Sequence, residues 1–244
     1  KYDNMDNEHE TLSINYGVEL GQFEFDATYY QNDFARDWFK VDKIDNKKVY
    51  GLGNGINNII GAANGGSLAA LSILNGDNDT PVEVKLKHNN REYESDGLDL
   101  RLNWSNDVHS VTVGYRDTED SEDRFQFYEY SQWSGGKMGA LTVGSPPGYS
   151  SNNRLTEADA EAFYIQDVIT LDNLTLNIGY RSEDWSITQE RYVDSARSAI
   201  NTEKGYPKTL ASDDASLFGL GAVYDISDEI SFYAGFHEGF TPTS

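Results

Sequence analysis

Three arginines and four aromatic residues in the second half of the chain are best suited to chemistry, and that chemistry is ligand capture. They fall in or beside segments that we expect to be loops: Arg124, Tyr128, Tyr130, Trp133, Arg154, Arg191 and Tyr192. A guanidinium group matches a carboxylate with two parallel hydrogen bonds, and an aromatic ring offers flat apolar contact. An arginine in an acidic loop is more often simply paired with a neighbouring carboxylate, and this alternative stays open for each of them.

The chain offers no constellation of residues for catalysis. It has no cysteine, which excludes a thiol nucleophile, a thiolate metal site and a disulfide framework. Its four histidines have no partner at the short spacings of a metal site, and Gly135-Gly136-Lys137 lacks the spacing of a phosphate-binding loop. We therefore expect no enzyme, no cofactor and no metal site.

Charge and hydropathy narrow the class of partner. Among the 244 residues, 41 are acidic and 19 are basic, which gives a formal net charge of −22 at pH 7. Such a chain repels the phosphate backbone, so we exclude nucleic acid as a partner. No run of about 18 apolar residues is present to form a transmembrane helix. A membrane β-barrel is not excluded, because only alternate residues of its strands meet lipid.

Alternating apolar and polar residues come in paired runs that are joined by very short turns. The four turns lie at Gly21, Ser105–Asp107, Asp172–Asn173 and Asp225–Glu229. Three long connections separate the eight runs, at roughly Asp42–Pro81, Asp117–Thr156 and Glu183–Ser212. Within the first, Leu68–Leu74 predicts a short helix, either on the surface or across the mouth of a barrel. Short turns on one side and long loops on the other are typical of an outer-membrane β-barrel.

The same alternation would also fit a soluble β-sandwich, which keeps one apolar and one polar face. Run length favours the barrel, because Leu12–Leu20 approaches the roughly 9–11 residues that cross a bilayer, whereas soluble strands average about 5–6. In the barrel we expect these side chains to face lipid: Leu12, Ile14, Tyr16, Val18, Leu174, Leu176, Ile178 and Tyr180. The polar residues between them would face the lumen, where recurrent glycines suit a crowded interior.

Three segments carry a resemblance to a known family. Ala162–Asp167 followed by Leu174–Glu183 resembles the strand pair A-x-Y-x-Q-D … L-T-L-x-x-G-x-R-x-E of TonB-dependent outer-membrane receptors. Gly219–Asp225 followed by Ile230–Pro242 resembles that family's pair G-x-V-Y … L-Y-A-x-Y-x-E-G-F-x-P. Tyr29–Val41 is similar to a strand of ferric-citrate-type members. The segments occur in the family's order and span most of the chain.

The resemblance implies an antiparallel transmembrane barrel of about twenty-two strands, filled by an N-terminal plug domain. Residues 1–244 would form about eight mid-barrel strands of one β-barrel domain with long extracellular loops, and would contain no plug. The implied location is the outer membrane of a Gram-negative cell. The implied partners are lipid and lipopolysaccharide, the TonB complex through an N-terminal region outside this stretch, and a ferric chelate such as a siderophore or ferric citrate.

The acidic loops disfavour a highly anionic chelate unless Arg124, Arg154 and Arg191 converge in space. Two other functions stay open beside uptake of a ferric chelate. One is a passive outer-membrane porin or adhesion barrel, and the other is a soluble ligand-binding β-sandwich module.

Overall fold

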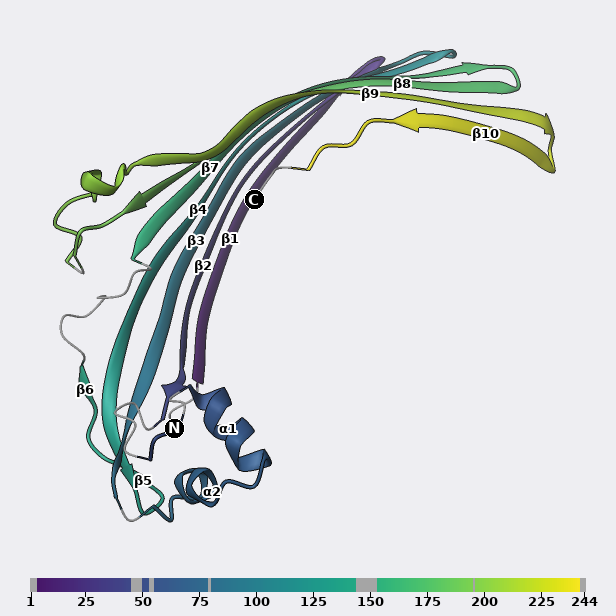
Figure 1. Ribbon diagram of the computed structural model, residues 1–244. Helices are drawn as coiled ribbons and strands as arrows, with labels where there is room; N and C mark the ends of the chain where they lie inside the picture. The colour runs from purple at the N-terminus through teal and green to yellow at the C-terminus, as the bar shows by residue number, and fades with distance from the viewer. Residues whose placement is uncertain are drawn as a thin grey trace.

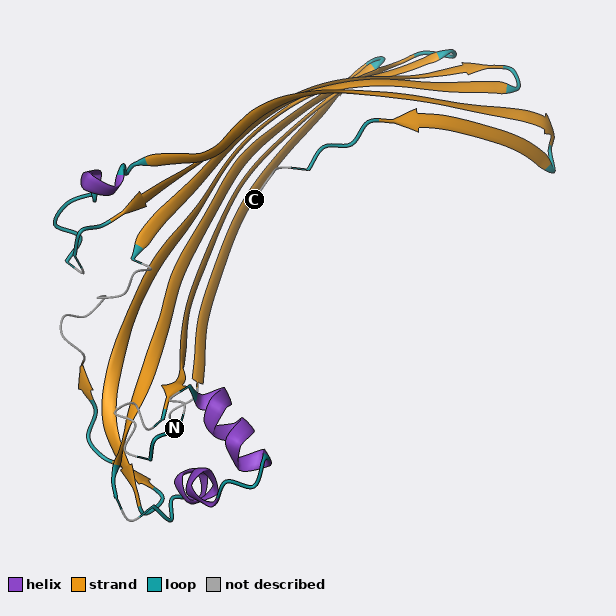
Figure 2. Ribbon diagram, in the orientation of Figure 1, coloured by secondary structure: helices purple, strands orange, loops and turns teal. Residues whose placement is uncertain are grey.

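The computed structural model describes residues 4–44, 50–52, 55–78, 80–143, 153–194 and 196–241. Eight strands are long: β1 (Asn4–Leu20), β2 (Phe23–Lys43), β3 (Val82–Ser105), β4 (His109–Ser134), β7 (Arg154–Leu171), β8 (Leu174–Arg191), β9 (Lys208–Ser227) and β10 (Ile230–His237). The connections contain five short elements: α1 (Ile56–Asn64), α2 (Leu68–Asn75), β5 (Lys137–Met138), β6 (Thr142–Val143) and the 3-10 helix η1 (Thr202–Lys204). Strands therefore dominate the described part of the chain (Figure 2).

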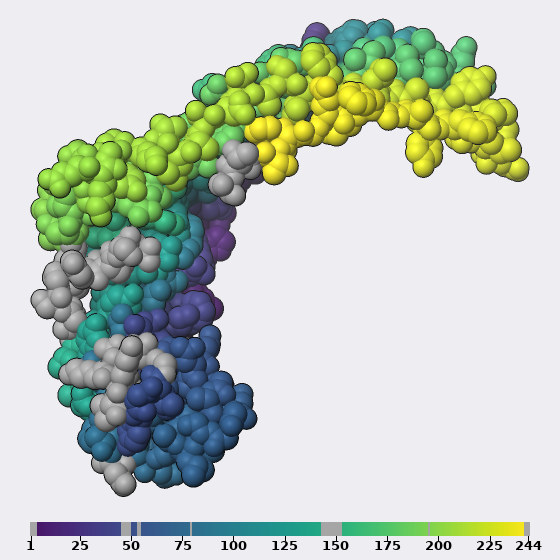
Figure 3. Space-filling model, in the orientation of Figure 1, coloured from purple at the N-terminus to yellow at the C-terminus, as the bar shows by residue number. Residues whose placement is uncertain are grey.

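The long strands form one antiparallel sheet in the order β1-β2-β3-β4-β7-β8-β9-β10, so each strand pairs with its neighbours in the sequence of long strands. β1 and β10 stand at the two ends of this order, and the sheet is open between them (Figure 1). In the space-filling view the sheet is a single curved wall that thickens where α1 and α2 pack (Figure 3). The predicted antiparallel barrel architecture appears here as a segment of barrel wall.

The four predicted hairpins are confirmed, and their turns lie at one end of the sheet, which we call the turn end. Gly21 adopts φ +66°, a conformation that glycine takes without steric cost. Asp172 adopts φ 45°, a region that aspartate tolerates better than most residues. The side chain of Asn106 accepts hydrogen bonds from the backbone N–H groups of Val108 and His109, which closes the β3–β4 turn.

Two of the three long connections are shorter than the sequence predicted, because the strands continue far beyond the alternating runs. β4 extends to Ser134 and β7 begins at Arg154, while β8 extends to Arg191 and β9 begins at Lys208. The predicted loops Asp117–Thr156 and Glu183–Ser212 were therefore wrong in their bounds. At this loop end both faces of the sheet carry polar residues, so the apolar and polar alternation disappears although the backbone ladder continues.

One face of the sheet, which we call the apolar face, carries the side chains predicted to meet lipid. A single row in register across seven strands is apolar throughout: Val18, Phe25, Leu102, Val113, Ile165, Tyr180 and Phe218. The other six predicted residues alternate along the same strands and share this face. Ile14 and Phe218 are 57% and 56% exposed, so these residues do not form a closed core between two sheets. This excludes the β-sandwich.

Glycines on the opposite, polar face make room for tyrosine rings from the next strand. A Cβ atom at Gly97 would lie 2.3 Å from the ring of Tyr30, and one at Gly114 would lie 2.0 Å from the ring of Tyr164. The rings lie flat over the neighbouring strand only because no side chain stands there. The prediction that glycines suit a crowded polar face is confirmed at these two positions.

The buried core lies at the loop end, between the sheet and the helices. Its members are Ile44, Ile59, Ala63, Ala70, Ile73, Val82, Val84 and Leu86. The helix predicted at Leu68–Leu74 is α2, which begins after the capping side chain of Ser67 and ends at Gly76 with φ +80°. Register places Val82, Val84 and Leu86 on the apolar face, so α1 and α2 cover that face and do not lie across the polar one. No helix in the described part of the chain is long and apolar enough to cross a membrane.

Candidate functional site: an arginine row on the polar face

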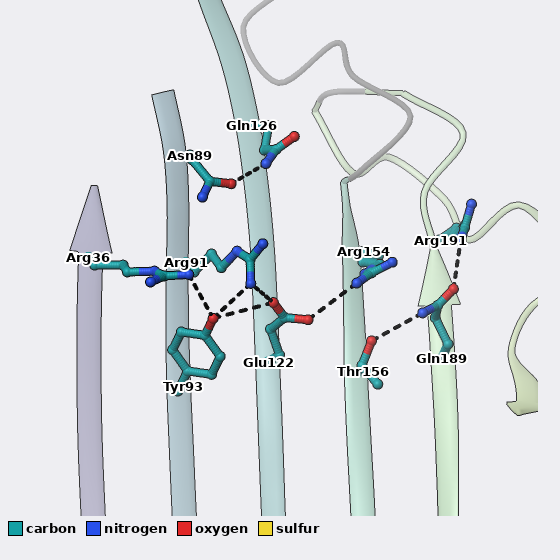
Figure 4. Close-up of polar contacts among 10 residues, drawn as sticks. All are labelled: Arg36, Asn89, Arg91, Tyr93, Glu122, Gln126, Arg154, Thr156, Gln189 and Arg191. Carbon is teal, nitrogen blue, oxygen red and sulfur yellow. Dashed lines mark hydrogen bonds and ion pairs between the residues drawn. The ribbon is translucent and has the colours of Figure 1, made fainter. Parts of the chain in front are cut away.

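Five arginines lie directly opposite one another on five adjacent strands. Register pairs Arg36 of β2 with Arg91 of β3, Arg91 with Arg124 of β4, Arg124 with Arg154 of β7, and Arg154 with Arg191 of β8. Figure 4 shows four of these side chains at nearly one level across the neighbouring strands. We call this set the arginine row. It lies near the loop end, on the polar face.

Such a row is unfavourable for the fold itself. Residues opposite each other on neighbouring strands have Cβ atoms about 4.5–5.5 Å apart, and like charges in these positions are destabilising. Arg124, at the centre of the row, has a pKa below its ordinary value, first because of burial and then because Arg91 and Arg154 are close. The row therefore concentrates positive charge in a chain whose net charge is −22.

The guanidinium groups are held by a few polar contacts. Arg91 Nη1 donates to Glu122 Oε1 at 2.7 Å and to the hydroxyl of Tyr93 at 2.9 Å, and Arg36 Nη2 donates to the same hydroxyl at 3.3 Å. Arg154 Nη2 lies 3.4 Å from Glu122 Oε2. The Nε atoms of Arg36, Arg91 and Arg154 are buried without a partner among the described residues. Within the described part of the chain, the row therefore contains buried hydrogen-bond donors that no residue satisfies.

The last arginine of the row is oriented by its neighbours. Arg191 Nε donates to Gln189 Oε1 at 2.8 Å, and Gln189 Nε2 in turn donates to the hydroxyl of Thr156 at 3.2 Å (Figure 4). The Arg191 guanidinium also lies 5.4 Å from the centre of the Tyr206 ring. None of these partners carries a negative charge, so they position the guanidinium without neutralising it.

Lysines and tyrosines extend the basic surface toward the loop end. Lys87 pairs in register with Lys40 and Tyr128, and Lys85 pairs with Tyr130. The Lys85 ammonium lies 3.4 Å from the centre of the Tyr128 ring, a cation–π contact, and 3.7 Å from Asp42.

Burial shifts the pKa of these groups in opposite directions. It lowers the pKa of Lys85 and Lys87, because burial disfavours the ammonium form. Burial raises the pKa of Tyr128 and Tyr130 for the same reason, since it disfavours the phenolate. Burial thus favours the uncharged form of all four side chains.

Charge on the apolar face has the opposite sign at the same level of the strands. A groove there is lined chiefly by acidic residues that alternate onto this face: Glu92, Glu94, Asp96, Glu119, Asp123, Glu157 and Asp159. Asp33 pairs in register with Glu94 beside this groove. On β2, β3, β4, β7 and β8, the lysines and arginines at this level all alternate onto the polar face. At this level carboxylates therefore predominate on the apolar face, where Arg197 is paired with Asp123, and cations predominate on the polar face.

Nearer the turn end, arginines of the polar face are paired one to one with acids. Arg101 Nη2 donates to Asp26 at 3.0 Å, and Arg116 Nε donates to Asp99 at 2.9 Å. Each carboxylate neutralises the arginine opposite it. The arginine row differs, because among the described residues the single carboxylate of Glu122 is shared by two of its arginines, Arg91 and Arg154.

Comparison with protein families identifies the kind of β-barrel to which this sheet belongs. The family model described as TonB dependent receptor-like, beta-barrel matches residues 2–244. The chain belongs to this family. No curated protein sequence matches it.

Solved structures agree with this receptor-barrel fold. The ferric citrate transporter FecA in its unliganded form is similar with a TM-score of 0.58 and 18% identity, over 96% of this chain and 27% of that one. The siderophore receptor PiuA from Acinetobacter baumannii is similar with a TM-score of 0.56 and 12% identity, over 96% of this chain and 32% of that one. BauA, the ferric preacinetobactin receptor from the same organism, has a TM-score of 0.54 and 11% identity, over 95% of this chain and 30% of that one. The receptor chain described here thus spans about a third or less of the length of these structures.

The receptor barrel brings together five of the seven residues that the sequence singled out. Arg124, Tyr128, Tyr130, Arg154 and Arg191 share the polar face. All five lie on strands, so their expected position in loops was wrong. The reason is the continuation of β4, β7 and β8 with polar residues on both faces.

The other two residues lie elsewhere. Trp133 alternates onto the apolar face, where it packs against the buried core and its Nε1 donates to the carbonyl of Ile73 at 2.7 Å. Tyr192 follows β8 and lies beneath the guanidinium of Arg197, 4.8 Å from ring centre to Cζ. Both side chains therefore have structural partners away from the arginine row.

Sequence reasoning missed Arg36, Arg91 and Glu122. A usable signal was present for two of them. Counting outward from the β3–β4 turn pairs Arg91 with Arg124, and it pairs Glu122 with Tyr93, two residues from Arg91. Arg36 could not be placed in this way, since a long connection separates β2 from β3.

Proposed function

We propose that this chain is part of an outer-membrane TonB-dependent transporter that takes up a ferric chelate with net negative charge. The observation that carries the proposal is the arginine row on the polar face, which lines the interior of the barrel. Guanidinium groups bind carboxylates and other anionic oxygens with paired, charge-assisted hydrogen bonds. The expectation that acidic surroundings disfavour an anionic ligand depended on whether Arg124, Arg154 and Arg191 converge, and register brings them onto adjacent strands.

The iron assignment is supported by the solved structures that share the fold. Their titles describe a ferric citrate transporter, a siderophore receptor and a ferric preacinetobactin receptor. The separation of charge supports the anionic character of the ligand, because a cationic chelate would be repelled inside the wall and attracted outside it.

The remaining partners follow from the faces of the wall. Outer-membrane lipid would cover the apolar band, and lipopolysaccharide would surround its outer edge in a Gram-negative cell. Energy would come from the TonB complex through a region outside residues 1–244. Nucleic acid is excluded by the net charge of −22.

The test uses the full-length receptor that contains this chain. A strain that depends on it for iron should grow under iron limitation when supplied with an anionic ferric chelate, and the purified receptor should bind that chelate. Uptake of an oligosaccharide or a corrinoid, together with no chelate binding and no iron-regulated expression, would overturn the iron assignment and leave the transporter class intact.

A further inference from the structure

The carboxylate of Glu122 contacts two arginines of the arginine row. It lies on β4, on the polar face, two positions from Arg124 in the sequence. Its two carboxylate oxygens contact different arginines: Oε1 lies 2.7 Å from Arg91 Nη1, and Oε2 lies 3.4 Å from Arg154 Nη2 (Figure 4). Those arginines belong to the strands on either side of β4. The carboxylate therefore bridges the middle of the row.

The contacts of this carboxylate resemble those that a bound ligand would make. An anionic ligand over the centre of the row would place its oxygens near Arg91, Arg124 and Arg154, where the Glu122 carboxylate now makes its two contacts. Each oxygen of Glu122 contacts one guanidinium, whereas a forked contact would give two parallel bonds to one arginine. The 3.4 Å contact to Arg154 lies beyond the usual range for such a pair.

We propose that Glu122 is an internal counter-anion that sets the minimum charge of the ligands the row accepts. The inference rests on the proposed function, because it concerns the same site. A ligand with several anionic oxygens displaces Glu122 from both arginines and replaces its single contact to each with paired hydrogen bonds. A ligand with one anionic group, or none, does not compensate for the lost contacts and is rejected.

The surrounding geometry supports displacement. Glu122 is 20% exposed at its side chain, so it can leave the row without disrupting a buried core. The side chains of Arg91 and Arg154 are 20% and 22% exposed, so an incoming oxygen can reach their guanidinium groups. The hydroxyl of Tyr93 accepts from Arg91 and lies 3.5 Å from Glu122 Oε1, so Arg91 stays oriented when the carboxylate departs.

The experiment measures ligand binding by the full-length receptor and its variants by titration calorimetry. Glu122→Gln removes the charge and keeps the shape of the side chain. Asp120→Asn is the matched control, because Asp120 lies on the same strand and face and its substitution changes the net charge equally. Ferric citrate serves as the multiply anionic probe, and a cationic ferric trihydroxamate serves as the comparison.

The expected result for Glu122→Gln is tighter binding of ferric citrate, on the order of tenfold, with binding of the cationic probe unchanged or weaker. Asp120→Asn should change neither affinity by more than about threefold. Glu122→Asp provides a second variant that keeps the charge but is too short to bridge both arginines, and it should give an intermediate gain.

One outcome would overturn the counter-anion inference alone, and another would overturn the proposed function as well. If wild type binds ferric citrate and neither Glu122 variant binds it more tightly, the counter-anion inference is overturned while the proposed function stands. If wild type and both variants bind no anionic ferric chelate, the proposed function is refuted and the inference falls with it.

Discussion

Substitution of the central arginine should separate ligand binding from stability. Arg124→Gln removes one guanidinium from the middle of the row while its neighbours Arg91 and Arg154 remain one strand away on each side. A charge-assisted hydrogen bond contributes about 1.5–3 kcal/mol, which corresponds to a loss of about 10- to 150-fold in affinity for an anionic chelate. The free energy of unfolding should change by less than about 1 kcal/mol, because relief of like-charge repulsion offsets the contacts that the arginine loses.

The control for this substitution is Arg116→Gln. Arg116 lies on the same strand and the same face, but its Nε donates to Asp99 at 2.9 Å, so its charge is already neutralised. The affinity for the chelate should fall by less than about threefold in this variant. Both affinities come from calorimetric titration of the full-length receptor in detergent, and both stabilities come from urea denaturation in the absence of ligand.

The reasoning would be refuted by either of two results. If Arg124→Gln and Arg116→Gln weaken binding equally, the position of Arg124 in the row has no special importance. If Arg124→Gln unfolds the receptor as strongly as it weakens binding, the arginine is structural and the row exists for the fold.

Three further predictions concern packing, membrane contact and pH. Gly114→Ala should lower the free energy of unfolding by about 1–3 kcal/mol, because its Cβ would enter the neighbouring tyrosine ring at 2.0 Å; Gly221→Ala, whose nearest contact would be 3.8 Å away, should be close to neutral in the same urea titration. Ile178→Arg on the apolar face should destabilise the folded protein in lipid vesicles, lowering its free energy of unfolding by about 2–4 kcal/mol. Asn177→Arg on the polar face should lower the free energy of unfolding by less than about 1 kcal/mol. Burial lowers the pKa of Lys87, so this residue loses its charge at a lower pH than a free lysine, and anion affinity should fall early as the pH rises toward 10.5. Lys87→Arg should delay that fall, and identical pH profiles would contradict the assignment.

The sequence predicted best the part of the wall that meets lipid. Contact with lipid demands an apolar residue at every second position, so runs such as Leu12–Leu20 reveal both the strand and its orientation. Beyond the membrane-facing band that demand ends, and strands such as β4 continue with charged, polar and aromatic residues on both faces. This pattern has no apolar period, so it was interpreted as loop.

The arginine row shows where prediction from sequence stops. Arg91 and Arg124 lie equally far from the short turn that joins β3 to β4, and Arg154 and Arg191 lie equally far from the turn between β7 and β8. Counting outward from these turns therefore pairs the arginines two by two. The alignment of Arg124 with Arg154 spans a long connection, and it becomes visible only when the sheet has assembled.

The opposite charges on the two faces of the wall have a consequence for the rate at which a ligand arrives. Packed sheets lie about 10 Å apart, which gives the scale of the wall's thickness, and the Debye length at physiological ionic strength is about 8 Å. A diffusing anion in solution on one side of the wall is within a Debye length of the charges on that side only, so it responds mainly to the face that it approaches. An anion is turned away from the outer surface, while the interior, bounded by a wall of low dielectric constant, focuses the attraction of the row. The association rate should consequently fall steeply as salt is added, and the lifetime of the bound complex, set by short hydrogen bonds, should change far less.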